Sequence, residues 1–368
     1  MVKEKLVSQK LSQKQAISII VMFIMGTAMI SGVGKEAEEN AWIAIALAGV
    51  MSSPIYLMYA YLLKTFKNKN IYDINVIVFG KHLGIIFSII FTWNGIYLSA
   101  ILIRKVAEFM NITGLNETPI MMIMLMLVLV SIYMIKKGIL IFGKWCQFYI
   151  CIVVIVVLFE VIFLTPSREL DVVYPVMYNG FAPVMQATIH IIAFPMVQVA
   201  HLLGFLNELD TKASYTKVFM YGLLIGTVIL IAITFDNITV LGPKMFSKAY
   251  YPSYLTFRQL SVGDFIRRIE ILSVLMFLIV GFVKYTATLF SAVIGLKHVF
   301  NLNNYYFIIV PVAFVCSILA FIAYEDLLEV ETLFYEIYTP YSLVINGLLP
   351  ILIYITYLAR SKLSRKEI

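Results

Sequence analysis

Two short segments carry residues that could bind a small polar molecule inside an otherwise apolar chain. Residues 26–34 read Gly-Thr-Ala-Met-Ile-Ser-Gly-Val-Gly and so place three glycines and two hydroxyls in nine positions. Each glycine weakens a helix by about 1 kcal/mol relative to alanine. Residues 190–201 contain Pro195, which removes a backbone donor and clashes with the preceding turn. Both segments are predicted to unwind, with close packing through small residues and a simple proline kink as the alternatives.

An unwound helix in this setting could recognise a zwitterion such as an amino acid. Free N–H groups of one half-helix bind a carboxylate, and free carbonyls of the other bind a cation. A third apolar segment contributes residues that share one helical face. The candidate ligand-binding residues are Gly26, Thr27, Ser31, Gly32, Asn94, Tyr97, Ile101, Phe194, Pro195 and Gln198. For Asn94 and Tyr97 the alternative is an interhelical hydrogen bond and an interfacial ring.

The elements that position these residues are predicted to be membrane-spanning helices. The 368 residues are 61% hydrophobic and only 13% charged, which is incompatible with a water-facing surface. Lipid leaves only helices or a closed barrel for the backbone, and the apolar runs here are continuous rather than alternating. Ten runs approach or exceed the roughly 20 residues that a span needs. They are Gln15–Gly34, Ala41–Leu63, His82–Ile103, Thr118–Ile135, Trp145–Leu164, Val172–Asn207, Val218–Phe235, Ile271–Leu296, His298–Tyr324 and Ile337–Ala359.

The basic residues predict that both ends of the chain are cytoplasmic. Eighteen Lys and Arg residues fall on the side of the amino end and nine on the opposite side. The net charge of +7 is thus explained by the membrane topology. The basic residues are scattered over short loops and tails, which argues against nucleic-acid binding. The three cysteines lack metal-ligand spacing, so neither a metal nor another cofactor is expected. No nucleophile–base pair is apparent, so we do not expect an enzyme.

The two predicted breaks lie in the first and sixth of the ten spans. This symmetric placement indicates two halves of five helices around a site at the membrane midplane, as in inverted-repeat transporters. We predict a cytoplasmic segment at 1–14, one ten-helix domain at 15–360 and a cytoplasmic tail at 361–368. The halves cover about 15–165 and 180–323, and a final helix covers 337–360.

Several short motifs, taken in their order and spacing, resemble the B-subunit family of spore germination receptors. That family is related to the amino acid/polyamine/organocation transporters and implies an all-α membrane fold of the LeuT type, with unwound helices 1 and 6. The likeness covers nearly the whole chain. The motifs are Leu11-Ser12-Gln13-Lys14-Gln15, Ala41-Trp42-Ile43, Gly80-Lys81-His82-Leu83-Gly84, Thr118-Pro119-Ile120, Phe194-Pro195 and Arg268-Ile269-Glu270.

The resemblance implies a subunit that binds a nutrient germinant, often an amino acid, in a transporter-like pocket. It also implies an A-type and a lipoprotein C-type partner subunit in the spore inner membrane. One departure concerns the sixth span, where Met196-Val197-Gln198 stands in place of the Phe-Gly-Glu found in many relatives. An amide replaces the carboxylate, which suggests a ligand preference of its own. The alternative function is a proton- or sodium-coupled amino-acid permease.

Lys284 is the charge predicted to lie deepest in the membrane. It follows Glu270 by fourteen residues, which at 1.5 Å per residue places it about 21 Å along the helix. A charge at that depth is a functional candidate by default. In the resembled fold the eighth helix packs beside the broken first helix, so the ammonium is expected to replace the sodium ion of related transporters and to bond free carbonyls of the first half-helix. Thr286 or Thr288 would join the pocket. The alternative is a neutral lysine that faces a wet cavity.

Overall fold

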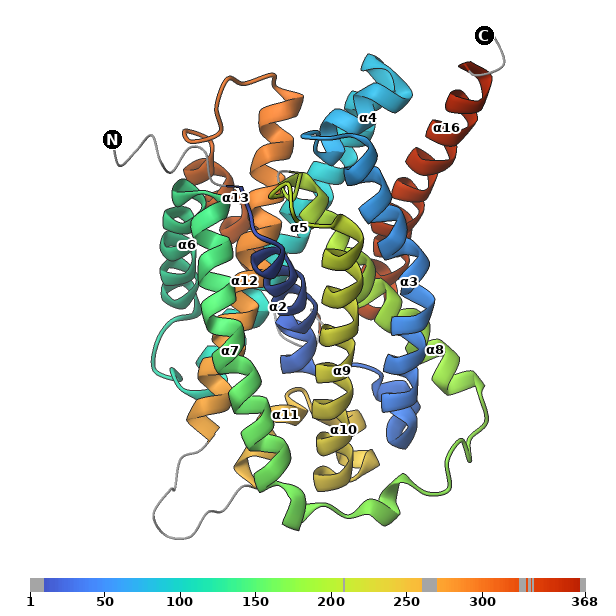
Figure 1. The fold of residues 1–368 in the computed structure, drawn as a ribbon. Helices are drawn as coiled ribbons and strands as arrows, with labels where there is room; N and C mark the ends of the chain where they lie inside the picture. Colours follow the sequence, from blue (N-terminus) through green and yellow to red (C-terminus); the bar gives the residue numbers. More distant parts are fainter. Residues whose placement is uncertain are drawn as a thin grey trace.

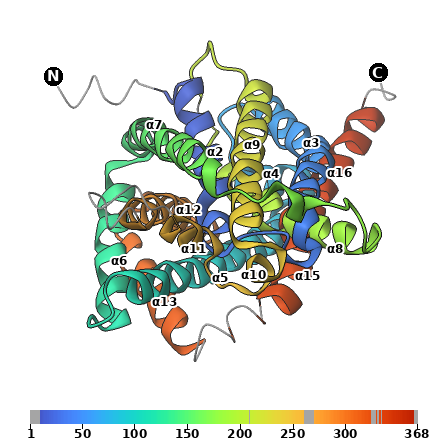
Figure 2. The ribbon, with the colours of Figure 1, turned by 90° about the horizontal axis from the view of Figure 1, so that it is seen from below.

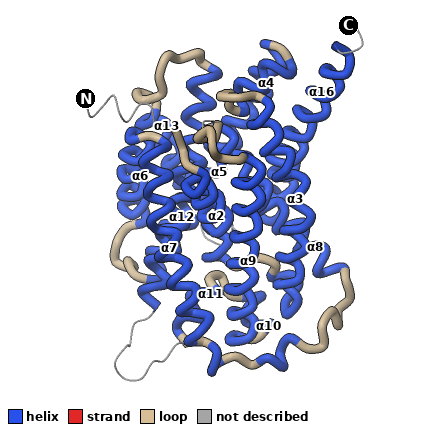
Figure 3. Tube along the Cα trace, viewed as in Figure 1, coloured by secondary structure: helices blue, strands red, loops and turns tan. Residues whose placement is uncertain are grey.

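The computed structural model describes residues 10–207, 209–259, 270–323, 329, 332 and 334–364. These residues form helices joined by loops (Figure 3). Among them, nine helical stretches are long and apolar enough to cross a membrane, and Ile309–Ile322 is a shorter apolar helix. The prediction of an all-α membrane protein with about ten spans is confirmed.

The helical elements that form the spans are α2 (Gln13–Ser31), η1 (Lys35–Asn40) with α3 (Ala41–Thr65), α5 (Lys81–Thr113), α6 (Ile120–Lys137), α7 (Ile139–Phe163), α8 (Ala182–Ile191) with η4 (Ile192–Met196) and η5 (Val197–Gly204), α9 (Tyr215–Leu241), α12 (Glu270–Val299), α13 (Ile309–Ile322), and η6 (Phe334–Tyr338) with α15 (Thr339–Ser342), η7 (Leu343–Leu348) and α16 (Leu349–Ser364).

Helix α2 lies inside the bundle and packs against α9, α12, α7 and α5 (Figures 1 and 2). Its span is 83% buried inside the protein, whereas the span of the peripheral α7 is 22% buried. The helix begins at Gln13 because Ser12 and Gln15 form a capping box: the Gln15 N–H donates to Ser12 Oγ (3.3 Å) and the Ser12 N–H donates to Gln15 Oε1 (3.0 Å). The residues of the first resemblance motif thus fix the start of the central helix.

The amino end of α2 and the carboxyl end of α16 lie on the same face of the bundle (Figure 1). Leu11 pairs with Leu209 in the loop after η5. In that loop, Asn207 Nδ2 donates to the Asn68 carbonyl (3.2 Å) between α3 and α4 (Ile71–Phe79). Helix α16 packs against α4. An even number of spans requires this arrangement, and the cytoplasmic assignment of the face stays a prediction.

Helix α5 is longer than predicted and buries charges. The third span was predicted to end at Ile103, yet the helix continues to Thr113 and buries Arg104, Lys105 and Glu108. Arg104 Nε donates to Glu108 Oε1 one turn later (2.6 Å), and this pairing lets both charges stay within the helix. Arg104 and Lys105, which follow the predicted end of the span, are therefore part of the helix.

Three other boundaries differ because glycine, proline and left-handed residues end helices. The first span stops at Ser31 because Gly32 has φ 69°. The sixth was predicted from Val172, but α8 begins at Ala182, after Pro175 and Gly180, and only Leu170–Val173 (η3) is helical before it. The ninth was predicted from His298, but α12 continues to Val299 and α13 begins at Ile309.

The motif Arg268-Ile269-Glu270 lies largely outside the described residues, as does the end of the predicted ninth span at Tyr324. Before this gap, the long connection after α9 folds into two short helices, α10 (Pro243–Lys248) and α11 (Pro252–Arg258). Within its described part, this connection is therefore largely helical.

Close packing between α2 and α9 depends on glycine. A Cβ atom added to Gly222 would lie 2.5 Å from Ile20 Cγ2, and one added to Gly226 would lie 3.0 Å from Ile24 Cδ1. Without side chains at these positions the two helices approach each other closely, as small residues allow in membranes. Dispersion contacts along this seam hold the central helix in place.

We expect Gly222→Val to lower the apparent melting temperature of the purified protein, because the added atoms meet Ile20 and overpacking costs about 1–3 kcal/mol. Val228→Ile is the matched control, since it adds one methylene to an exposed side chain of the same helix. Thermal unfolding in lipid nanodiscs measures both. Equal melting temperatures for the two variants would contradict the close α2–α9 seam.

Candidate functional site

The first helix is interrupted at Gly26, as predicted. Gly26 has φ 17° and ψ −127°, which separates α2 into two halves. Lys284 of α12 packs directly on this residue: a Cβ atom at Gly26 would lie 2.9 Å from Lys284 Cβ and closer still to its Cδ. Only a residue without a side chain leaves room for the lysine.

The outer half of α2 is held by α11. Ser253 Oγ donates to the Met29 carbonyl (2.9 Å), and Asn237 Nδ2 of α9 donates to Ser253 Oγ (3.0 Å). Gly32 lies against Pro252, so that a Cβ atom there would be 2.7 Å from Pro252 Cγ. Ser31, in the same half-helix, is buried. The outer half of the first helix is therefore linked to α9 through one serine.

The sixth helix is interrupted at Phe194, also as predicted. Phe194 has extended backbone angles (φ −147°, ψ 118°), and its peptide bond to Pro195 is cis. The α-helical first half ends at Ile191, a π-helical turn follows, and Val197–Gly204 continues as a 3-10 helix. The proline is the physical cause, because it supplies no N–H and prevents a regular α-helix here.

Neighbouring helices satisfy the carbonyls that this break releases. Ser342 Oγ of α15 donates to the Ala193 carbonyl (2.9 Å). Tyr56 and Tyr59 of α3 donate their hydroxyls to the carbonyls of Met196 (3.0 Å) and Val197 (3.2 Å). In lipid these carbonyls have no water to bind, so the three side chains make the irregular segment tolerable.

Two lysine side chains converge on the ring of Phe194 at this break. Lys284 Nζ lies 4.1 Å from the Phe194 ring centroid and 5.2 Å from the Phe23 centroid. Lys105 Nζ of α5 lies 6.0 Å from the Phe194 centroid. Both lysines are at most 5% exposed. Cation–π attraction holds the ammoniums at one ring, although their like charges repel.

Lys284 does not make the hydrogen bonds expected of it. Within the described residues, its Nζ has no hydrogen-bond partner, and neither has the buried Thr27 Oγ1. The expectation that the ammonium bonds free carbonyls of the first half-helix is wrong for this structure. The aromatic rings of Phe23 and Phe194 occupy the positions next to the ammonium, so the lysine keeps its donors unused.

A buried amide network lies beside the second break. Asn94 Nδ2 of α5 approaches His201 Nε2 (3.1 Å) and donates to Asn346 Oδ1 of η7 (2.8 Å). Gln198 Nε2 donates to the hydroxyl of Tyr338 (3.2 Å), whose ring centroid is 6.0 Å from that of Tyr97. The oxygens Asn94 Oδ1 and Gln198 Oε1 are buried and have no partner among the described residues.

The remaining candidates lie in different environments. Ile101 is buried on α5. Thr288 Oγ1 donates to the Lys284 carbonyl of its own helix (2.8 Å). Thr286 Oγ1 lies 2.9 Å from Ser131 Oγ of α6, so its hydroxyl contacts α6 and not the broken helices.

Sequence reasoning missed several residues of this region. Lys105 was left outside the third span because the run without charged residues ends at Ile103, although the spacing of four between Arg104 and Glu108 indicates an intrahelical pair. Tyr56, Tyr59 and Asn346 gave no signal, because single polar residues in apolar spans have no diagnostic pattern. A list of uncharged polar residues near the midplane of each span would have included them.

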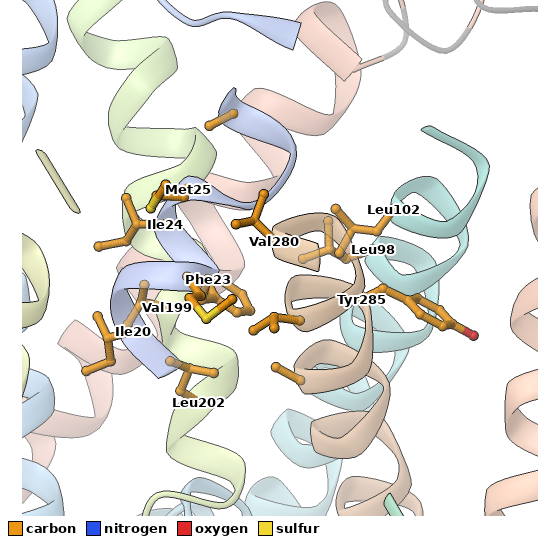
Figure 4. Close-up of a cluster of buried hydrophobic side chains, with 14 of the residues drawn as sticks. Ile20, Phe23, Ile24, Met25, Leu98, Leu102, Val199, Leu202, Val280 and Tyr285 are labelled. Atoms are coloured by element: carbon orange, nitrogen blue, oxygen red, sulfur yellow. The ribbon is translucent and has the colours of Figure 1, made fainter. Parts of the chain in front are cut away.

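The inner side of the first break is closed by apolar side chains. Figure 4 shows buried apolar side chains of α2, α5, α12 and η5 in this region, among them Phe23, Leu98, Leu102, Leu202 and Val280. Charges next to such a surface are poorly solvated, so they interact strongly with an ion of opposite sign.

The spore germination protein family matches residues 10–326 of the chain. This chain belongs to that family. Among the relatives of this spore germination protein, spore germination protein KB of Bacillus subtilis (strain 168) is 22% identical over 298 residues, which cover 80% of each chain. The family membership agrees with the resemblance found in the sequence motifs.

Two solved transporter structures share the fold of this spore germination protein. The nucleobase–cation symporter Mhp1, in a closed conformation with bromovinylhydantoin bound, superposes with a TM-score of 0.70 at 14% identity and covers 95% of this chain and 78% of its own. MhsT in complex with L-phenylalanine superposes with a TM-score of 0.68 at 11% identity and covers 95% and 99%. The five-plus-five transporter fold with broken first and sixth helices is thereby confirmed.

We expect Gly26→Ala to destabilise the protein by about 1–3 kcal/mol, because the new methyl group meets Lys284. The double variant Gly26→Ala/Lys284→Ala should recover most of this loss, and a double-mutant cycle measures the coupling. Gly114→Ala is the control, since its Cβ atom would have only one neighbour, at 4.0 Å. Additive effects of the Gly26 and Lys284 substitutions would contradict their direct contact.

Proposed function

We propose that this chain is the ligand-binding membrane subunit of a nutrient germinant receptor, and that its germinant is an amino acid bound between the two broken helices. The observation that carries the proposal is the convergence of Lys284 and Lys105 on the ring of Phe194. Membership of the spore germination protein family and the transporter fold support it.

The ligand carboxylate is assigned to the two lysines. Lys284 is a buried ammonium beside the Phe194 ring, and buried charge in a membrane is costly unless it is paired. The neighbouring pair of Arg104 and Glu108 is neutral as a unit. A carboxylate placed beside Lys284 Nζ would accept hydrogen bonds from a donor that has no other partner in the described part of the chain.

The ligand ammonium is assigned to the amide side of the break. Asn94 Oδ1 and Gln198 Oε1 are buried acceptors without a partner among the described residues, and Thr27 Oγ1 is a third. An ammonium has three donors and no acceptor, so it matches a set of unused oxygens. Donors on one side and acceptors on the other favour a zwitterion over a simple anion or amine.

Gln198 sets the charge of the acceptor side in this proposal. Where the family resemblance implies a carboxylate, this chain has an amide that donates to Tyr338 and retains one oxygen without a partner among the described residues. A neutral acceptor attracts an ammonium less strongly than a carboxylate does. The preference therefore shifts toward ligands whose carboxylate contributes most of the binding.

Lys284 is proposed to stand in for the sodium ion of related transporters. Its positive charge is covalently fixed beside the Gly26 break, in contact with Phe23 and Phe194. A fixed charge removes the need for a coupling ion. In the assembled receptor, we propose that the A-type and lipoprotein C-type subunits in the spore inner membrane respond to the ligand-bound state.

Thermal-shift assays should identify the ligand class. We expect an L-amino acid to raise the melting temperature with the logarithm of its concentration, because it binds only the folded state. The corresponding amine without a carboxylate should give no shift at the same concentrations. A shift by sugars or nucleosides, with none by amino acids, would contradict the proposal.

Substitution of the two lysines should abolish this stabilisation. Lys284→Met and Lys105→Met each remove one ammonium, and we expect the apparent dissociation constant of the amino acid to rise at least tenfold, which corresponds to about 1.4 kcal/mol. Lys137→Met is the matched control, because Lys137 also lies over an aromatic ring, that of Tyr133 (5.2 Å), at an exposed site. Unchanged ligand binding and folding in Lys284→Met would disprove the role of this lysine.

Counterflow of labelled amino acids in liposomes separates a sensor from a permease. A permease must alternate between the two faces, whereas a sensor needs only different affinities in two states of an assembly. We expect the isolated chain to bind the amino acid without accumulating it. Robust counterflow by the isolated chain would instead establish the proton- or sodium-coupled permease.

A further inference from the structure

A second buried polar site lies between the carboxyl ends of α7 and α9, away from the two breaks. Arg168 follows α7 and folds back onto it: its Nη2 donates to the Val161 carbonyl (2.7 Å) and pairs with Asp236 Oδ1 of α9 (2.5 Å). Glu160 precedes Val161 in the chain and lies within electrostatic range of both Arg168 and Asp236. Glu160 thus belongs to the same cluster as Arg168 and Asp236.

The cluster contains several polar atoms that make no hydrogen bond. Glu160 is fully buried, and both of its carboxylate oxygens lack a partner in the part of the chain that the structure describes. In the same described residues, Asp236 Oδ2 and Arg168 Nε are buried and also without a partner. A buried carboxylate with two unmet oxygens is among the costliest groups in an apolar environment.

The charges of the cluster do not balance. Two carboxylates and one guanidinium leave a net charge of −1 when all three are ionised. Helices α2, α6, α9 and α12 pack against α7, and among the described residues the charges that act on Glu160 come from Asp236 and Arg168. Arg168 carries one positive charge, and its Nη2 binds Asp236 and the Val161 carbonyl, so neutralising both carboxylates requires one further positive charge.

We propose that Glu160 is an exchangeable proton-binding site, in which one proton neutralises the cluster in the buried state. An O–H bond forms on one carboxylate oxygen of Glu160 with a proton taken from water, and no other bond changes. The protonated carboxyl becomes a donor, and Asp236 Oδ2 in the same cluster is an acceptor without another partner. A proton fits better than a metal cation, because the described cluster supplies few oxygens for coordination.

The site is connected to the first broken helix. Asn237 follows Asp236 on α9 and donates to Ser253, which in turn donates to the Met29 carbonyl in the outer half of α2. Loss of the proton would leave two carboxylates against one arginine, which adds like-charge repulsion between α7 and α9. The proton therefore biases the position of the half-helix that borders the candidate ligand site.

Infrared difference spectroscopy of the full chain in nanodiscs tests this proposal. At neutral pH the wild-type protein should show the C=O stretch of a buried carboxylic acid, which shifts to lower wavenumber when the proton exchanges in D₂O. Isotope labelling of the glutamate carboxyls should move this band, and labelling of aspartate should not. This measurement needs no substitution and so does not depend on the folding of a variant.

Glu160→Gln should remove the band, whereas Glu169→Gln should retain it, because Glu169 is an exposed glutamate in the segment after α7. Arg168→Gln should double the band, since a second carboxyl then needs a proton. Absence of a protonated glutamate in the wild-type spectrum at neutral pH would overturn the proposal. A Na⁺-dependent rise in melting temperature that Glu160→Gln abolishes, without such a band, would overturn it in favour of a sodium site. Either result leaves amino-acid binding at the broken helices untouched.

Discussion

The structure depends on satisfying the backbone at two interrupted helices in a solvent that offers no hydrogen bonds. A released carbonyl in lipid costs several kcal/mol, so each break needs dedicated partners. At the sixth helix these are Tyr56, Tyr59 and Ser342, from the second and tenth spans. At the first helix, Ser253 binds the Met29 carbonyl from outside the bundle. Each break is therefore a place where helices far apart in the chain are hydrogen-bonded to one another.

The two interruptions also allow Lys284 and Lys105 to lie between the first and sixth helices. Phe194 adopts extended backbone angles and presents its ring to Lys284 and Lys105, while α2 gives room to Lys284 only because residue 26 is glycine. Unused donors on one side and the unused oxygens of Asn94 and Gln198 on the other make the region complementary to a zwitterion. Transporters with this kind of fold bind coupling ions near such a junction. In this chain the positive charge there belongs to the side chain of Lys284. This difference is consistent with a protein that senses a ligand rather than one that moves it against a gradient.

The sequence predicted the membrane class, about ten spans, both interruptions and the depth of Lys284, because apolar length, glycine clusters and proline act locally. It did not predict that Lys105 belongs to the site. The burial of Lys105 depends on the Arg104–Glu108 pair, which extends α5 by three turns beyond the apolar run. The contact of Thr286 with Ser131 of α6 could not be predicted either, because the rotation of a helix about its axis is set by the helices that pack against it. Contacts between distant spans, such as Tyr59 with Asn346, carry no sequence pattern at all.

The most direct test of the account is a structure of the protein determined with a stabilising amino acid bound, in which the position of the ligand carboxylate is measured. The account predicts that the carboxylate lies beside Lys284 Nζ, against the Phe194 ring and between the halves of the first and sixth helices. It predicts the ligand ammonium next to Asn94 and Gln198. A ligand located elsewhere would contradict the account. One such place is the cavity on the face that carries the chain ends, lined by Asp73, Lys297 and His298.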